Sequence, residues 1–174
     1  MYEKFGQFID GKWQPSEKNE TYEVINPANE EIIGHASKAT PADVDKALKS
    51  AEKGLEVWKK TSPWKRSSTI RKIADLIREK QDILAKWLTL EVGKPFAEGK
   101  GEAGATAEIF EWNSEETKRI YGQTVESRFE DTRVHIYYQP VGVVAALVPW
   151  NFPLILAARK ISTALAAGCS VICK

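Results

Sequence analysis

The C-terminal part of the chain carries the stretch that decides the fold: VGVVAALV at residues 141–148, PWNFP at 149–153, LILAARKISTALAA at 154–167 and SVIC at 170–173. The first segment is rich in Val, which favours a strand. The second is interrupted by prolines, and the third has the Leu and Ala content of a helix, with Gly168 placed as its C-cap. Uninterrupted apolar strands joined through a helix are typical of parallel sheets. The stretch therefore predicts a β-α-β unit and an α/β fold class.

Short strands are expected at the other end of the chain. Asp10-Gly11 lies between apolar residues, a strong hairpin signal. Residues 22–25 and 31–35 are further strand candidates, separated by turn-forming residues. Much later, the alternation of residues 134–138 predicts a second hairpin, at about residues 123–139.

Three helices are expected between these strands. Thr40 followed by Pro41 predicts the start of the first, with an acid three residues after the cap. Ser62-Pro63 opens a second, whose apolar periodicity continues to a C-cap at Gly93. A third is expected from Pro95 to about Arg119.

The composition is that of an ordinary folded protein. The 174 residues are 43% hydrophobic, with 25 Lys+Arg, 24 Asp+Glu and a net charge of +1. These values exclude disordered, collagen-like and disulfide-scaffold classes, and they provide no basic surface for nucleic acid. The charges are unevenly spread, because only Arg159, Lys160 and Lys174 lie in residues 140–174. The chain thus ends in an apolar segment, which we expect to be the beginning of a larger core.

Three features favour a cytoplasmic protein without a membrane segment. Residues 1–6 lack the pattern of a signal peptide. The uncharged run at residues 137–158 is long enough for a membrane helix, but Pro149 and Pro153 interrupt it, which favours a strand, a loop and a helix. Cys169 and Cys173 are four apart in an expected strand, a geometry that disfavours a disulfide between them. Buried, reduced thiols are expected instead.

Several other patterns are explained by structure alone. GKGEAG at residues 99–104 matches the GxGxxG nucleotide fingerprint, but its surroundings look helical, and Glu98 and Glu102 would repel a pyrophosphate. A helix face of small residues is expected there. His35 and His135 have no companions at metal-ligand or triad spacing, so no metal site is expected.

The basic residues of the second helix have a similarly simple interpretation. Arg71, Lys72 and Arg78 are interleaved with Asp75 and Glu79, which compensate them. We expect a solvated helix face rather than a nucleic-acid patch.

The loop at residues 149–153 is different. Asn151 lies between two aromatic residues and two prolines, after the carboxyl end of a parallel strand, where open α/β sheets place ligands. Its NH2 group is a donor of the type that stabilises an oxyanion. From the residues alone, a rigid loop with a turn Asn is an equally good interpretation.

Several motifs keep a familiar order along the chain: INPA at residues 25–28, LEVGKP at 90–95, KRIYG at 118–122, PWNFPL at 149–154, RK at 159–160, ALAAGC at 164–169, and the final Lys174. With these motifs the whole chain resembles the aldehyde dehydrogenase superfamily. With EGKGE at 98–102 it most resembles the succinate-semialdehyde dehydrogenase branch. The resemblance implies the N-terminal part of that fold, an incomplete Rossmann-like parallel sheet with flanking helices.

The resemblance also implies roles for individual residues. Asn151 matches the catalytic amide that donates a hydrogen bond to the oxyanion. The residues expected to bind the NAD or NADP cofactor are Leu147, Pro149, Trp150 and Lys174. Phe152 and Leu156 match positions that line the aldehyde tunnel, and Arg159 matches an arginine that binds a substrate carboxylate. For Arg159, an ion pair between helices is the alternative.

In this family a cysteine thiolate attacks the aldehyde, hydride passes to the cofactor, and a glutamate activates water to hydrolyse the thioester. The resemblance implies that this cysteine and glutamate follow Lys174, that Cys169 and Cys173 are not the nucleophile, and that residues 1–174 alone are inactive.

The resemblance further implies that residues 1–122 and 140–174 belong to the NAD(P)-binding domain. Residues 123–139 would form an oligomerisation arm of a homo-oligomer. A non-catalytic short paralogue that acts as a binding or subunit-interaction module is the alternative.

Overall fold

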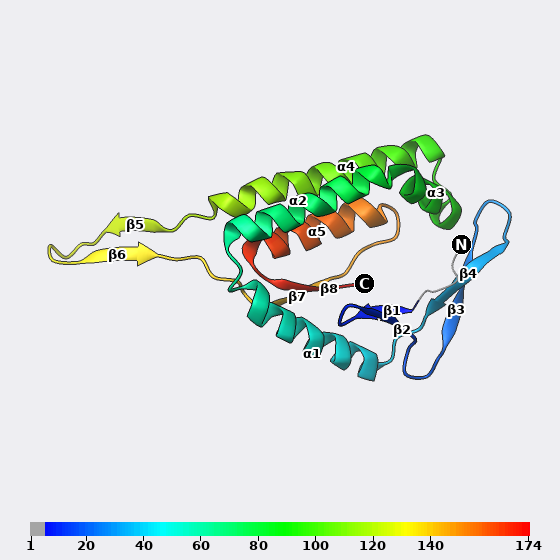
Figure 1. Cartoon of the computed structure of the whole chain (residues 1–174), viewed down its shortest axis with the longest axis horizontal. Coiled ribbons are helices and arrows are strands. Elements are labelled where there is room, and N and C mark those ends of the chain that lie inside the picture. The colour runs from blue at the N-terminus through cyan, green and yellow to red at the C-terminus, as the bar shows by residue number, and fades with distance from the viewer. Residues whose placement is uncertain (1–5) are drawn as a thin grey trace.

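A computed structural model describes residues 6–174. The expectation about a signal peptide falls on residues 1–6 and so lies almost entirely outside the described part. Helices α2 (Pro63–Glu79), α4 (Phe96–Glu116) and α5 (Pro153–Ala167) lie side by side (Figure 1). The parallel strands β7 (Val143–Ala146) and β8 (Ser170–Cys173) lie between α5 and α1 (Pro41–Trp58). Helices therefore cover both faces of a small, open parallel sheet, which confirms the α/β class.

The N-terminal strands form two antiparallel hairpins. Strands β1 (Gln7–Ile9) and β2 (Lys12–Gln14) pair across Asp10 and Gly11, both at positive φ (54° and 73°) as the Asp-Gly sequence predicted. Strands β3 (Thr21–Ile25) and β4 (Ile32–Ser37) pair next, with an irregularity between Val24 and Ile25.

Helix α1 (Pro41–Trp58) begins with the predicted cap. The Thr40 hydroxyl accepts a hydrogen bond from the Asp43 backbone, and the Asp43 carboxylate accepts one from the Thr40 backbone. Asp43 also accepts bonds from the Glu17 backbone, at 3.1 and 3.2 Å. These hydrogen bonds, chiefly the one from Thr40, lower the pKa of the Asp43 carboxyl. Through the Glu17 N–H, the cap connects the start of α1 to the segment between the two hairpins.

The expected second helix is in fact two, so that prediction was wrong. Helix α2 (Pro63–Glu79) ends at Lys80, whose φ and ψ are −101° and 15°, and α3 (Gln81–Val92) begins directly after it. Neither Gly nor Pro marks the break in the sequence. Both helices pack against α4, and the Gln81 side chain donates a hydrogen bond to the Lys100 carbonyl of α4 (2.8 Å). The change of chain direction at Lys80 allows both α2 and α3 to pack against α4.

Helix α4 (Phe96–Glu116) continues into a 3-10 turn, η1 (Thr117–Arg119), after Gly93 ends α3 at positive φ. The GxGxxG match lies inside α4, as expected from its helical surroundings. A side chain at Gly99 would come within 3.0 Å of the Ala85 carbonyl oxygen. This glycine therefore permits the close approach of α3 and α4.

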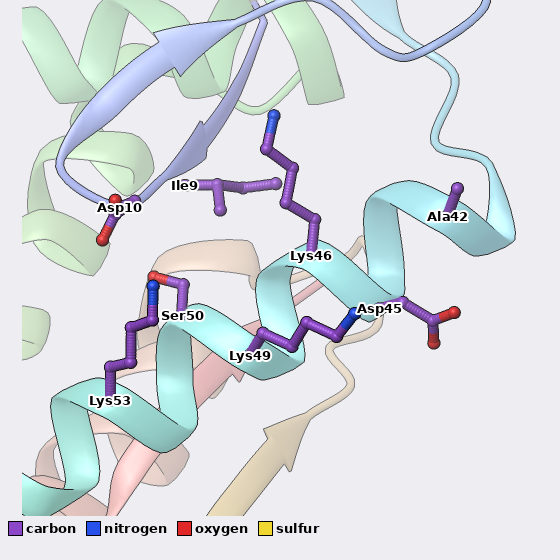
Figure 2. Close-up of a pocket in the computed structure, with 8 residues that line it drawn as sticks. All are labelled: Ile9, Asp10, Ala42, Asp45, Lys46, Lys49, Ser50 and Lys53. Carbon is purple, nitrogen blue, oxygen red and sulfur yellow. The ribbon is translucent and has the colours of Figure 1, made fainter.

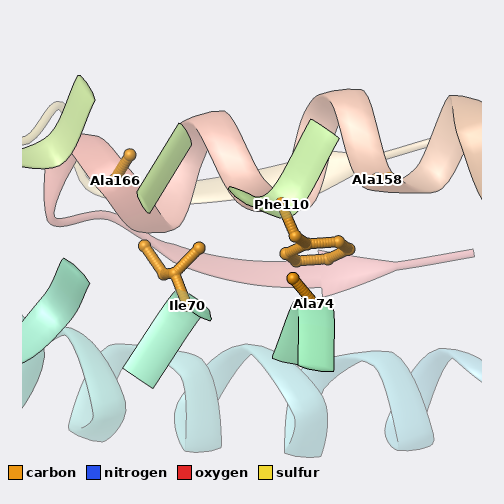
Figure 3. Packing of buried hydrophobic residues seen from close by; sticks show 5 residues of the cluster. All are labelled: Ile70, Ala74, Phe110, Ala158 and Ala166. Atoms are coloured by element: carbon orange, nitrogen blue, oxygen red, sulfur yellow. The ribbon is translucent and has the colours of Figure 1, made fainter. Parts of the chain in front are cut away.

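The hydrophobic core joins three helices that lie side by side, α2, α4 and α5. It contains Ile70 and Ala74 of α2, Phe110 of α4, and Ala158 and Ala166 of α5 (Figure 3). At the surface, Arg71 and Arg78 pair with Asp75 and also reach across to Glu111 of α4. The expected helix face is therefore part of an ion-pair network between helices.

Strands β5 (Gln123–Glu126) and β6 (Arg133–Ile136) form the expected second hairpin, which projects away from the helices (Figure 1). All eight of their residues are exposed. His135 contacts Thr124 across the hairpin, Nδ1 to Oγ1 at 3.0 Å. Among the described residues, no group of three His, Cys, Asp or Glu side chains could hold a metal ion.

The β-α-β unit is as predicted. Strands β7 (Val143–Ala146) and β8 (Ser170–Cys173) are parallel, joined through α5 (Pro153–Ala167), and Gly168 caps that helix at φ 91°. Both cysteines are free thiols, but only Cys169 is buried; Cys173 is exposed, contrary to expectation. Within residues 6–174, no helix has the length and apolar character needed to span a bilayer.

Ile70→Ala tests the helical core. Ile70 is fully buried, so we expect a loss of about 2–5 kcal/mol in the free energy of unfolding of this chain. Leu76→Ala, on the same helix at a side chain that is 52% exposed, should cost no more than about 0.5 kcal/mol. Urea unfolding of both variants gives the comparison, and equal losses would contradict the assigned core.

Candidate functional site

The candidate site is the loop that joins β7 to α5. Beyond the end of β7, the Lys174 N–H donates to the Ala146 carbonyl (2.9 Å) and the Val148 N–H donates to the Lys174 carbonyl (2.8 Å). These two bonds extend the parallel pairing past the two strands. They place Lys174 beside the root of the loop, at the carboxyl edge of the sheet where α/β proteins bind nucleotides.

The residues expected to bind the cofactor are exposed at this edge. Leu147 is 69% exposed and Trp150 78%, and both Pro149 and Lys174 are exposed. Apolar surface and a lysine at the ends of parallel strands are the groups that a dinucleotide needs for its ring faces and its ribose hydroxyls. The residues present therefore fit an NAD-type cofactor.

Asn151 offers a free side-chain amide. Within residues 6–174 its side chain has no hydrogen-bond partner, and the residue is exposed. Its backbone, in contrast, is held, because Lys94 Nζ donates to the Asn151 carbonyl oxygen at 3.2 Å. The arrangement presents two N–H donors on a restrained backbone, as an oxyanion site requires.

Helix α5 begins without a cap of its own. Phe152, at the N-cap position, makes no side-chain capping bond, and Pro153 has no N–H to offer. The next two N–H groups, of Leu154 and Ile155, donate to Glu102 Oε1 at 3.0 and 3.3 Å. A carboxylate of α4 therefore caps α5 across the helix interface and occupies the place where a bound anion would lie.

The charge of Glu102 is balanced by Lys94. Lys94 Nζ and Glu102 Oε2 form an ion pair whose side chains are only 7% and 1% exposed. The same Nζ lies 3.7 Å from the centre of the Phe152 ring, a cation–π contact. One buried pair thus contacts the backbone or side chain of Asn151, Phe152, Leu154 and Ile155.

This buried pair was not predicted from the sequence. Glu102 was interpreted only as a charge that would repel a pyrophosphate, and Lys94 only as part of a motif. A signal was present, because Glu102 shares a helix face with Gly99, Ala103 and Thr106, small residues that mark a packed surface. A carboxylate on such a packed face needs a partner of opposite charge, but the sequence does not indicate which residue that partner is.

The three residues expected to meet the substrate follow one another along α5. The Leu156 N–H donates to the Phe152 carbonyl (3.0 Å), which places Leu156 one turn beyond Phe152, and Arg159 lies in the following turn. Phe152 is 46% exposed, Leu156 is half-buried and Arg159 is exposed. Of the ion pairs among residues 6–174, none includes Arg159, so the alternative of an interhelical pair is not seen there. Its guanidinium is available to an anion.

An open pocket of about 410 Å³ lies elsewhere, between the first hairpin and α1 (Figure 2). Its charged lining is mixed, with Lys46, Lys49 and Lys53 opposed by Asp10 and Asp45. None of its lining residues belongs to the loop or to α5. It is therefore separate from the candidate site.

Comparison with known proteins identifies the family of the chain. The model of the aldehyde dehydrogenase family matches residues 13–174. The chain is 42% identical over 167 residues to glutarate-semialdehyde dehydrogenase of Pseudomonas aeruginosa, covering 96% of this chain and 35% of that protein. It is 40% identical over 166 residues to the NADP(+) succinate-semialdehyde dehydrogenase of Escherichia coli, covering 95% and 34%.

Solved structures show the same relationship. An NADP-dependent enzyme of E. coli superposes with a TM-score of 0.95 at 38% identity, over 99% of this chain and 36% of that one. Betaine aldehyde dehydrogenase of Staphylococcus aureus, in complex with NAD+, superposes with a TM-score of 0.94 at 34% identity, over 98% of this chain and 35% of that one. The chain spans about a third of the length of these proteins. It belongs to the aldehyde dehydrogenase family.

Proposed function

We propose that residues 1–174 are the N-terminal portion of an NAD(P)-dependent aldehyde dehydrogenase that oxidises a carboxylated aldehyde such as succinate semialdehyde. The observation that carries the proposal is the loop before α5. The Asn151 amide, which has no partner within residues 6–174, follows the exposed residues at the sheet edge and precedes the helix that carries Arg159. Family membership supports the reaction type.

In this proposal Asn151 is the catalytic residue of the segment. When a cysteine thiolate from the remainder of the enzyme adds to the aldehyde carbon, the carbonyl oxygen gains negative charge. The Asn151 NH2 donates a hydrogen bond to that oxygen and lowers the barrier to addition. Because Lys94 holds the Asn151 backbone carbonyl, the side-chain amide needs little reorganisation during the reaction.

Leu147, Pro149, Trp150 and Lys174 would hold the cofactor, NAD or NADP, which would supply the hydride acceptor for the oxidation. Three of the proteins compared above support this class, because two E. coli enzymes are named for NADP and betaine aldehyde dehydrogenase was solved with NAD+. Lys174 would hydrogen-bond to ribose hydroxyls, while the apolar loop residues would lie along the nicotinamide side.

Substrate choice is proposed to rest on α5. Phe152 and Leu156 would line the aldehyde tunnel, and Arg159 would bind the carboxylate at the far end of the substrate. The glutarate- and succinate-semialdehyde dehydrogenases among the relatives are named for aldehydes with such a carboxylate.

Arg159→Leu in the complete reading frame tests the substrate assignment. We expect KM for succinate semialdehyde to rise about 10- to 100-fold, because a hydrogen bond to a charged group contributes about 1.5–3 kcal/mol. KM for butanal, an uncharged aldehyde of the same length, should stay unchanged. Formation of reduced cofactor measures both, and an unchanged KM for the semialdehyde would contradict the role of Arg159.

Residues 1–122 and 140–174 are proposed to form part of the cofactor domain, and residues 123–139 an oligomerisation arm in a cytoplasmic homo-oligomer. The exposed, projecting hairpin supports the arm, since it could add to the sheet edge of another subunit. The same hairpin supports the alternative, a non-catalytic module that binds other subunits. Free thiols at both cysteines are consistent with a reducing compartment.

The isolated chain is expected to be inactive. Its thiols are Cys169, which is 2% exposed, and Cys173, which ends β8, and neither is proposed as the nucleophile. Purified residues 1–174 should reduce no NAD or NADP with succinate semialdehyde, whereas the product of a reading frame extended beyond Lys174 should do so. Turnover by the isolated chain would refute this expectation, and an inactive extended protein would favour the module.

A further inference from the structure

The buried pair of Lys94 and Glu102 holds the backbone at Asn151 and again at the start of α5. Lys94 donates to the Asn151 carbonyl, and Glu102 accepts the N–H groups of Leu154 and Ile155. We propose that Lys94 and Glu102 are positioning residues, which fix the direction of the Asn151 amide toward the reacting oxygen. This inference rests on the role proposed for Asn151.

The anchoring leaves the segment little freedom. Only Phe152 and Pro153 separate the anchored residues, the φ of Pro153 is fixed by its ring, and the Phe152 ring lies against Lys94 at 3.7 Å. Trp150, on the other side of Asn151, is 78% exposed. The restraint on Asn151 therefore comes chiefly from α4 and the turn before it, through the buried pair.

Stability alone is a poor explanation for the pair. Two ions lose their hydration when they are buried, and apolar residues of similar volume often stabilise a fold equally well or better. What apolar residues cannot do is accept the two N–H groups of α5 or donate to the Asn151 carbonyl. The feature that would be lost with the pair is the geometry of the loop.

The first requirement is a variant that folds without the pair. Glu102→Ala leaves the Lys94 charge buried without its partner, so we expect a large drop in melting temperature. The double variant Lys94→Met/Glu102→Leu fills the space with uncharged side chains and should melt close to the parent chain. Circular dichroism of residues 1–174 measures both, and the double variant is used for kinetics.

Kinetics in the complete enzyme then form a cycle with Asn151→Ala. Asn151→Ala should lower kcat about 100- to 1,000-fold, the effect of removing one oxyanion donor. Lys94→Met/Glu102→Leu should lower kcat about 10- to 100-fold through misplacement, with KM for the aldehyde changed less than about threefold. In the triple variant the two losses should not multiply, because an amide that has been removed cannot be misplaced.

Two further variants sharpen the result. Lys94→Met/Glu102→Gln keeps an oxygen that accepts the Leu154 and Ile155 N–H groups, so it should recover part of kcat. Lys100→Met/Asp82→Leu removes a surface pair (2.8 Å) between α4 and α3 and should leave kcat and KM unchanged.

The outcomes separate the two claims. If Asn151→Ala lowers kcat and the losses multiply in the triple variant, the positioning role is wrong while the proposed function stands. If Asn151→Ala leaves kcat unchanged, the proposed function of Asn151 fails, and the positioning role fails with it. A normal kcat in the folded Lys94→Met/Glu102→Leu enzyme also overturns the inference.

Discussion

The Glu102 side chain is only 1% exposed, so groups of the protein must replace the water that would otherwise hydrogen-bond to its carboxylate. Three donors do so. One is the Lys94 ammonium, and the other two are the first available N–H groups of α5. The partial positive charge at a helix N-terminus favours a carboxylate, so the ion pair and the helix end stabilise the same charge. The position of α5 relative to α4 depends on this arrangement, and so does the loop before α5.

The rest of the β-α-β unit is arranged around that helix end. The cluster of Ile70, Ala74, Phe110, Ala158 and Ala166 joins α5 to both α2 and α4. At the far end of α5, Gly168 turns the chain directly into β8. The Asn151 amide and the Arg159 guanidinium have no partner within residues 6–174. They lie on a loop and a helix whose backbone is held by Lys94 and Glu102 at one end and capped by Gly168 at the other. Such rigidity is what a preorganised site requires.

Local patterns carried much of the prediction. The Val-rich and Leu/Ala-rich segments predicted β7, α5 and β8 and their parallel pairing, and Asp10-Gly11, Thr40 and Gly93 predicted turns and caps, because each of these signals acts within a few residues. The break at Lys80 was not predictable, because it follows from the packing of α2 and α3 on α4. The cap that Glu102 provides joins residues 52 and 53 positions apart, and no local pattern encodes such a contact. The candidate site was thus located from the sequence, but the interactions that hold it were not.

Amide hydrogen exchange at Leu154 and Ile155 in residues 1–174 is the most direct test of the central claim. N–H groups in the first turn of a helix normally have no intrahelical acceptor and exchange with solvent quickly. The account predicts that both exchange much more slowly than the N–H of Lys65, which donates to the Ser62 hydroxyl at the exposed start of α2. Exchange of Leu154 and Ile155 as fast as that of Lys65 would contradict the account, because Glu102 would then not hold α5.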